Sequence, residues 1–262
     1  MLVEQLGDGD PEIAVVAGIH GDEPCGVRAV ERLLDDEPTV RRPVKLVVAN
    51  EEALEQGVRY LEADMNRVFP GDPDADTHEE RLAAAVQAEV EDCLTFSIHS
   101  TRSYDDPFAV YDVLTEYVRQ IIPRLPVAAV VETGDSVEGR LQTSVDVIEV
   151  EAGLQGSEAA AENADRLTRA FLTATGVLPG NVPANAIPRF RLHERIPKAP
   201  AERYEVFVEN FQRVDSGTAY AAVDGHEQVA EGDFYPVLLS TDGYEDVFGY
   251  TASRLDDLTV TT

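Results

Sequence analysis

Short apolar runs alternate with longer segments of helical periodicity through the first two thirds of the chain. Apolar runs of about five residues bounded by turn residues are typical of buried strands, whereas apolar positions three and four apart are typical of helices. The pattern predicts strands at 13–17, 44–49, 94–98, 108–113, 127–131 and 145–150, and helices at 24–34, 77–93, 114–122 and 157–175. Strands that alternate with helices indicate an α/β domain with a doubly wound, mostly parallel sheet.

The pattern changes after residue 175. A segment rich in Gly and Pro at 176–183 is typical of a linker. Beyond it lie short stretches of β character, separated by Gly and Asp turns, at 204–208, 218–223, 235–239 and 247–251. We therefore predict two domains, an α/β domain at 1–175 and a small β-rich C-terminal domain at 176–262.

The charge balance is strongly acidic. The 262 residues include 50 Asp and Glu against 21 Lys and Arg, a net charge of −29, and the only lysines are Lys45 and Lys198. Such a surface repels nucleic acids and anionic membranes, so neither is expected as a partner. We interpret it as the surface of a halophilic protein from a salty cytoplasm; the alternative is an ordinary acidic protein.

Localisation signals point to the cytoplasm. The sequence starts without the basic and apolar segments of a signal peptide, and no apolar run approaches the ~20 residues that span a bilayer. The two cysteines, Cys25 and Cys93, indicate a reducing compartment without a disulfide framework.

A candidate metal site follows two of the predicted strands. His20 and Glu23 form an H-x-x-E pair directly after the first strand, and His99 follows the strand at 94–98. In open α/β sheets, ligands gather beyond the carboxyl ends of strands. Zinc takes imidazole and carboxylate ligands and, in catalytic sites, leaves one position open.

Two further clusters carry candidate chemistry. Arg59, Asn66 and Arg67 lie in a segment punctuated by Pro and Gly, where they are suited to hold an acidic group; surface ion pairing is the alternative. Glu149 and Glu151 lie two residues apart on a predicted strand, so they share a face, and one of them is a candidate general base. A solvated strand face is the alternative for this pair.

The order of these motifs resembles the succinylglutamate desuccinylase/aspartoacylase family, relatives of the zinc carboxypeptidases. The motifs are H-x-x-E, then R-Y-L-E-A-D-M-N-R-V-F, then H-S-T and E-A-G, in order between residues 18 and 153. The resemblance implies a catalytic α/β domain followed by a smaller β-rich domain. Residue by residue, it implies the following roles: His20, Glu23 and His99 bind Zn²⁺, Arg59 donates to the substrate carbonyl, Asn66 and Arg67 hold a substrate carboxylate, Arg140 and Tyr244 contact the substrate, and Glu151 is the acid/base.

The position of the acid/base stays open between Glu151 and Glu149. Glu151 preserves the E-x-G motif, whereas the Gln155–Gly156 pair is spaced about as well from Glu149. We prefer Glu151.

The resemblance implies a zinc-dependent hydrolase whose substrate is a small molecule, an N-acyl acidic amino acid. The enzyme would cleave the amide bond and release a carboxylate and the free amino acid. Three alternatives remain: a metallocarboxypeptidase-like peptidase, a deacylase of another N-acylated metabolite, and a binding protein that has lost turnover. The sequence leaves homo-oligomer formation, the acyl group and the metal used in the cell undetermined.

Overall fold

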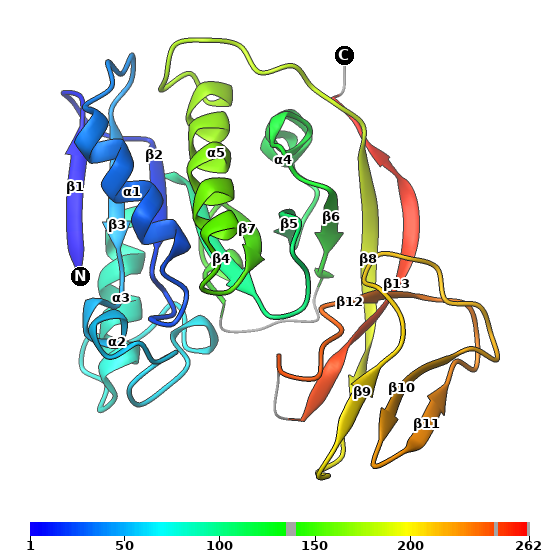
Figure 1. The fold of residues 1–262 in the computed structure, drawn as a ribbon. Helices are drawn as coiled ribbons and strands as arrows, with labels where there is room; N and C mark the ends of the chain where they lie inside the picture. Colours follow the sequence, from blue (N-terminus) through cyan, green and yellow to red (C-terminus); the bar gives the residue numbers. More distant parts are fainter. Residues whose placement is uncertain (135–139, 244–245, 261–262) are drawn as a thin grey trace.

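The computed structural model describes residues 1–134, 140–243 and 246–260 (Figure 1). Across these residues, ten strands form one sheet. In spatial order the strands are β1 (Leu2–Leu6), β3 (Val44–Val48), β2 (Ile13–Ala17), β4 (Leu94–Thr101), β7 (Val147–Leu154), β5 (Phe108–Tyr111), β6 (Ala129–Glu132), β8 (Ile187–Pro197), β13 (Val247–Leu258) and β12 (Tyr235–Val237).

The sheet is mixed in direction. Strands β3, β2, β4 and β7 pair in parallel, and so do β5, β6 and β8. Strand β5 runs antiparallel to β7, and β1, β13 and β12 add antiparallel pairs at the two edges. The predicted α/β class is confirmed, with antiparallel strands at more places than the sequence pattern indicates.

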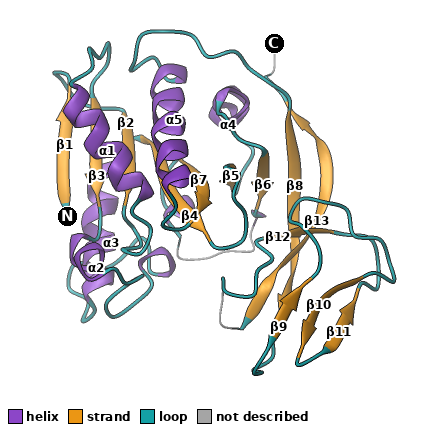
Figure 2. Ribbon diagram, viewed as in Figure 1, coloured by secondary structure: helices purple, strands orange, loops and turns teal. Residues whose placement is uncertain are grey.

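Helices cover both faces of the sheet (Figures 1 and 2). Helices α1 (Cys25–Asp36), α4 (Glu116–Ile121) and α5 (Glu158–Ala174) contribute to one apolar core with the sheet, and α3 (His78–Val90) contributes to a second core on the opposite face. At the start of α3, the Thr77 hydroxyl accepts from the Glu80 N–H, as an N-cap residue does. The shorter helical elements are α2 (Glu51–Gln56), η1 (Met65–Arg67), η2 (Ile122–Arg124) and η4 (Leu141–Thr143).

Two central strands have opposite character on their two faces. On β4, Phe96 and Ile98 join the core of α1 and α5, whereas His99 alternates with them and points to the other face. On β7, Glu149 and Glu151 alternate with core residues in the same way. Polar groups of two adjacent strands therefore gather on the face that α3 covers.

The C-terminal part contributes to two sheets. Strands β9 (Tyr204–Val206), β10 (Ala219–Val223) and β11 (His226–Val229) form a separate antiparallel sheet, and β8, β12 and β13 extend the main one. The main sheet thus continues across residue 175, and the domain boundary placed there stays a prediction. In the described part of the chain, no helix is long and apolar enough to cross a membrane.

Candidate active site

Three buried side chains meet where β2 and β4 end. His20 follows β2, Glu23 lies just before α1, and His99 lies near the end of β4. The Nδ1 atom of His20 is 2.9 Å from Oε1 of Glu23, and the Nδ1 atom of His99 is 3.1 Å from Oε2 of the same carboxylate. All three are less than 5% exposed. Among the described residues, this is the group of His, Cys, Asp and Glu whose ligand atoms converge closely enough for a metal ion.

The three residues each offer one ligand atom, and these atoms lie within 4.8 Å of one another, as the ligands of one metal ion do. With zinc bonds of about 2.0–2.1 Å, neighbouring ligands in a tetrahedron lie about 3.3 Å apart. Hydrogen bonds from protonated imidazoles to Glu23 would have similar lengths, but the outer ring nitrogens favour a metal. His20 Nε2 lies 3.2 Å from Oδ1 of Asp64, and His99 Nε2 lies 3.1 Å from the Ser97 hydroxyl. Metal-binding histidines characteristically use the second nitrogen in this way, so these residues fit zinc.

The charges at this centre are strongly coupled. Burial alone would raise the pKa of Glu23, but attraction and hydrogen bonds from His20 and His99 outweigh it and hold the pKa well below its usual range. Burial opposes the charge on His99, yet the contacts with Glu23 raise the pKa of His99 to about 9. A cation at this point would take the place of the proton that Glu23 stabilises on His99.

The loop from Arg59 to Arg67 lies against the same centre. Arg59 donates to Oε1 of Glu23 at 3.0 Å and to Oδ2 of Asp64 at 3.1 Å. Asp64 therefore links Arg59 to His20, and these contacts hold the pKa of Asp64 well below its usual value, against the effect of burial. Asp64 had no predicted role, although its position between Arg59 and Arg67 in the sequence is a signal for one.

Glu79 holds this loop from beneath, and sequence reasoning missed it. Its carboxylate is fully buried and accepts the backbone N–H groups of Leu61 at 2.6 Å and of Glu62 and Ala63 at 3.1 Å. A fourth hydrogen bond comes from the Asn50 amide at 3.2 Å. Burial raises the pKa of Glu79, but these hydrogen bonds outweigh it and lower the pKa overall.

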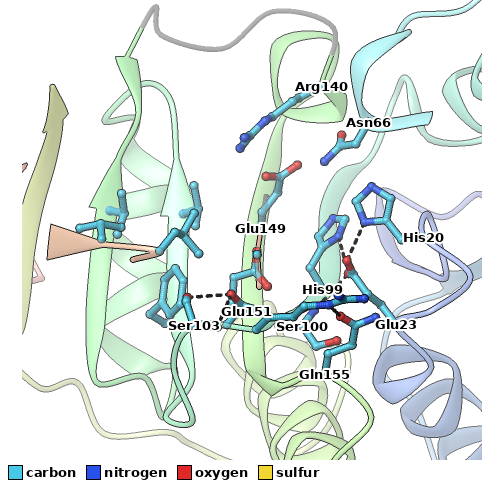
Figure 3. Close-up of a pocket in the computed structure, with 18 of the residues that line it drawn as sticks. His20, Glu23, Asn66, His99, Ser100, Ser103, Arg140, Glu149, Glu151 and Gln155 are labelled. Atoms are coloured by element: carbon cyan, nitrogen blue, oxygen red, sulfur yellow. Dashed lines mark hydrogen bonds and ion pairs between the residues drawn. The ribbon is translucent and has the colours of Figure 1, made fainter. Parts of the chain in front are cut away.

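Both candidate bases point into the cavity. Glu149 and Glu151 project from β7 toward the side where His20 and His99 lie (Figure 3). Glu151 pairs in register with His99, whereas Glu149 pairs with Ser97, one pleat repeat farther from the strand ends. Burial, and then the charge of Glu23, raise the pKa of Glu151 to about 7. Glu151 is thus suited to exchange a proton near neutral pH.

The predicted carboxylate-binding residues lie at one end of the same cavity. Asn66, Arg67 and Arg140 all line it, and Figure 3 shows Arg140 on the side of Glu149 that faces away from Glu151. The Asn66 side-chain carbonyl accepts the Leu141 N–H at 3.1 Å, which orients its amide. Tyr244, the remaining predicted substrate contact, lies outside the described residues.

The cavity has a volume of ≈ 260 Å³. Its opposite end is apolar and was not anticipated from the sequence. Residues of β5 and β6 and of the C-terminal strands line it, among them Phe108, Val131 and Val237.

Comparison with known proteins agrees with this geometry. Residues 9–105 match the succinylglutamate desuccinylase/aspartoacylase catalytic domain. Over 82 residues, the chain is 34% identical to succinylglutamate desuccinylase of Pseudomonas fluorescens, and 34% identical over 84 residues to that of Pseudomonas aeruginosa. Each match covers 30% of this chain and about a quarter of the relative's length, 25% in both cases.

Solved structures show the same fold over nearly the whole chain. The ectoine utilization protein EutE (DoeB) from Ruegeria pomeroyi superposes with a TM-score of 0.79 at 20% identity, covering 98% of this chain and 88% of that one. Succinylglutamate desuccinylase from Vibrio parahaemolyticus gives 0.69 at 17% identity over 97% and 86% of the two chains. Murine aminoacylase 3 gives 0.71 at 17% identity over 96% and 99%. The matched segment is thus that of a succinylglutamate desuccinylase/aspartoacylase catalytic domain, and solved structures of succinylglutamate desuccinylase and aminoacylase 3 share the fold of nearly the whole chain.

Proposed function

We propose that this protein is a zinc-dependent deacylase of N-acyl amino acids, with His20, Glu23 and His99 as the metal ligands. The observation that carries the proposal is the convergence of two Nδ1 atoms on one buried carboxylate, next to the raised-pKa carboxyl of Glu151. When bound, zinc supplies a Lewis acid that polarises the amide carbonyl and activates water.

The residues around the centre supply proton transfer and orientation. Glu151 takes a proton from the water whose oxygen attacks the carbonyl carbon, and returns it to the amide nitrogen as the C–N bond breaks. The products are a carboxylic acid and the free amino group. Arg59 donates toward the oxygen on which negative charge develops, and its contacts with Glu23 and Asp64 fix its guanidinium.

Substrate orientation is assigned to the end of the cavity with Asn66, Arg67 and Arg140. An arginine guanidinium and an amide can hold a carboxylate at a fixed distance from the reacting bond. An N-acyl amino acid carries such a carboxylate and a simple amide does not, so these residues would distinguish the two. That the amino acid is acidic stays a prediction from the resemblance.

The test is metal analysis of protein purified in high salt, with hydrolysis measured on N-acetyl and N-succinyl amino acids and on dipeptides. Zinc near one equivalent, with cleavage of the N-acyl amino acids, supports the proposal. Cleavage of dipeptides alone would support the peptidase alternative. Zinc binding without any turnover would support a binding protein.

A further inference from the structure

We infer that the substrate carries one carboxylate and a sizeable apolar group, and that this group lies on an apolar floor formed by Phe108, Val110 and Val131. The inference rests on the proposed deacylase function and departs from the acidic substrate that the resemblance implies. Three independent features carry it: the register of the strands, the residues that close the cavity above them, and the engagement of its arginines.

Strand register places the apolar floor beside the two candidate bases. On the antiparallel pair β5–β7, Phe108 is the partner of Glu151, and Val110 is the partner of Glu149. Val131 on β6 is the partner of Val110. Register partners share a face of the sheet, with Cβ atoms about 5 Å apart. The floor therefore begins directly next to the carboxylates and extends about 10 Å across two strands.

All three floor residues line the cavity and belong to one apolar cluster. Phe108 and Val131 are 1% exposed and Val110 is 8% exposed. Phe108 packs against Phe211 of the same apolar cluster, with ring centroids 5.3 Å apart. The floor is thus a packed surface that keeps its shape, and an apolar group placed on it loses contact with water.

The C-terminal strands close the cavity opposite the floor. Val237 and Leu238 line it there. Leu238 has a φ of 56°, which is unfavourable for a residue with a side chain. Asn210 fixes this segment, because its side chain accepts the Leu239 N–H at 2.8 Å and donates to the Ser103 carbonyl at 2.8 Å. A strained leucine in a segment that is tied to Ser103, which also lines the cavity, is consistent with a role in shaping the site.

The arginines of the cavity are suited to one substrate carboxylate. Arg59 is engaged by Glu23 and Asp64, and Arg102 by Gln155 at 2.7 Å and Asp22 at 3.4 Å. Arg140 has a buried Nε without a hydrogen-bond partner in the described part of the chain, whereas Arg67 donates through Nη1 to the Asn66 carbonyl at 2.7 Å and has its other donors left for the substrate. Glu149 lines the same cavity, and one of its buried oxygens also lacks a partner among the described residues. A second substrate carboxylate would meet either this negative charge or the apolar floor, where burial of an unpaired charge is costly.

The experiment compares two substrate series on the zinc-loaded protein in high salt. One series keeps the acetyl group and changes the amino acid through alanine, leucine, phenylalanine and aspartate. The other keeps alanine and lengthens the acyl group from acetyl to butanoyl and hexanoyl, with N-succinylglutamate as the acidic reference. In one of the two series, kcat/KM should rise about fourfold for each methylene added. A rise in the first series places the amino acid side chain on the floor, and a rise in the second places the acyl group there.

A matched pair of variants tests the floor itself. Val131→Thr keeps the shape and adds a hydroxyl to the floor, so the preference for apolar over alanine-sized groups should fall roughly fivefold or more. Val130→Thr makes the same change on the opposite face, where Val130 belongs to the core of α1 and α5. It should leave that preference unchanged even where it lowers stability.

Binding constants from calorimetry keep this inference separate from the proposed function. If no compound is hydrolysed, the deacylase proposal fails, and tighter binding of the apolar compounds would still support the floor. If N-acetylaspartate or N-succinylglutamate is preferred in both turnover and binding, the inference is overturned. It is also overturned if Val131→Thr and Val130→Thr have the same substrate preference.

Discussion

The two ends of the cavity are built in different ways. The metal end is defined by His20, Glu23, His99 and the Arg59–Arg67 loop. Its residues lie near strand ends and in a loop, and contacts of about 3 Å between charged side chains determine its geometry. The apolar end, defined by Phe108, Val110, Val131, Val237 and Leu238, comes from strand interiors, and register determines it. The metal end should therefore govern whether the reaction occurs, and the apolar end which substrate is chosen.

Loss of a metal ligand should have the largest effect. His99→Ala removes an imidazole that is 4% exposed, and the loss of a Lewis acid corresponds to a fall in kcat/KM of roughly 10³-fold or more. Zinc content by mass spectrometry should fall with it. His193→Ala is the control, since His193 is exposed and hydrogen-bonds Ser253. A zinc-free His99→Ala protein with full activity would contradict the metal assignment.

The candidate bases should give the next largest effect. Glu151→Gln is expected to lower kcat by roughly 10²–10⁴-fold with zinc content intact, because it removes a positioned acid/base. Glu149→Gln, on the same strand face, should cost much less. If Glu149→Gln lowers kcat far more than Glu151→Gln does, Glu149 is the base and the E-x-G alignment is wrong by two residues.

Asp64 should act on the metal end through His20. Asp64→Ala removes the partner of His20 Nε2, and loss of such a contact weakens metal binding roughly 10–100-fold. Zinc affinity measured by chelator competition checks this, with Asp74→Ala as a control on an exposed aspartate in the following segment. If the two variants bind zinc with equal affinity, Asp64 does not support the metal site through His20 and only orients Arg59.

Glu79 should affect stability in a pH-dependent way. Glu79→Gln leaves buried N–H groups without a full set of acceptors, at a cost of about 1–3 kcal/mol near neutral pH. Because the folded-state pKa of Glu79 is lowered, its contribution is complete above the pKa of an unfolded glutamate and is lost as pH falls through the folded value.

Denaturant unfolding at neutral and acidic pH measures this contribution. The stability difference between Glu79→Gln and the parent should shrink on acidification, and Glu91→Gln, an exposed control, should show little difference at either pH. A difference that grows toward acidic pH would contradict the sign.

Salt should affect neither end selectively. With a net charge of −29, the free energy of unfolding should rise as KCl increases from millimolar to molar, because carboxylate repulsion becomes screened. The ratio of kcat/KM between two substrates of equal charge should stay constant. A melting temperature that is flat or falls with KCl would count against a salt-adapted surface.

The sequence predicted the metal end better than the apolar end for a physical reason. His20 and Glu23 are close in the chain, and His99 ends a recognisable apolar run, so local pattern and the strand-end rule suffice. The floor depends on strand order and on the reversed direction of β5, neither of which local periodicity encodes. The hydrogen bonds of Glu79 to residues 61–63 were missed for the same reason, because they join segments that are distant in the sequence.

Strand β8 shows how an element itself escaped the pattern. Its sequence, IPRFRLHERIP, alternates apolar with charged residues as a half-buried strand does, but prolines lie near both ends and the segment was not among the predicted strands. It nevertheless pairs with β6 on one side and β13 on the other.

The path of the chain between β4 and β5 has a consequence for redesign. Strand β5 follows β4 in sequence, but β7 lies between them in the sheet, so residues 102–107 pass across the end of the strand that carries Glu151. An insertion there would shift Phe108 and Val110 relative to both carboxylates. Chimaeras between relatives should therefore exchange side chains on β5 and β6 while keeping the length of this crossing constant.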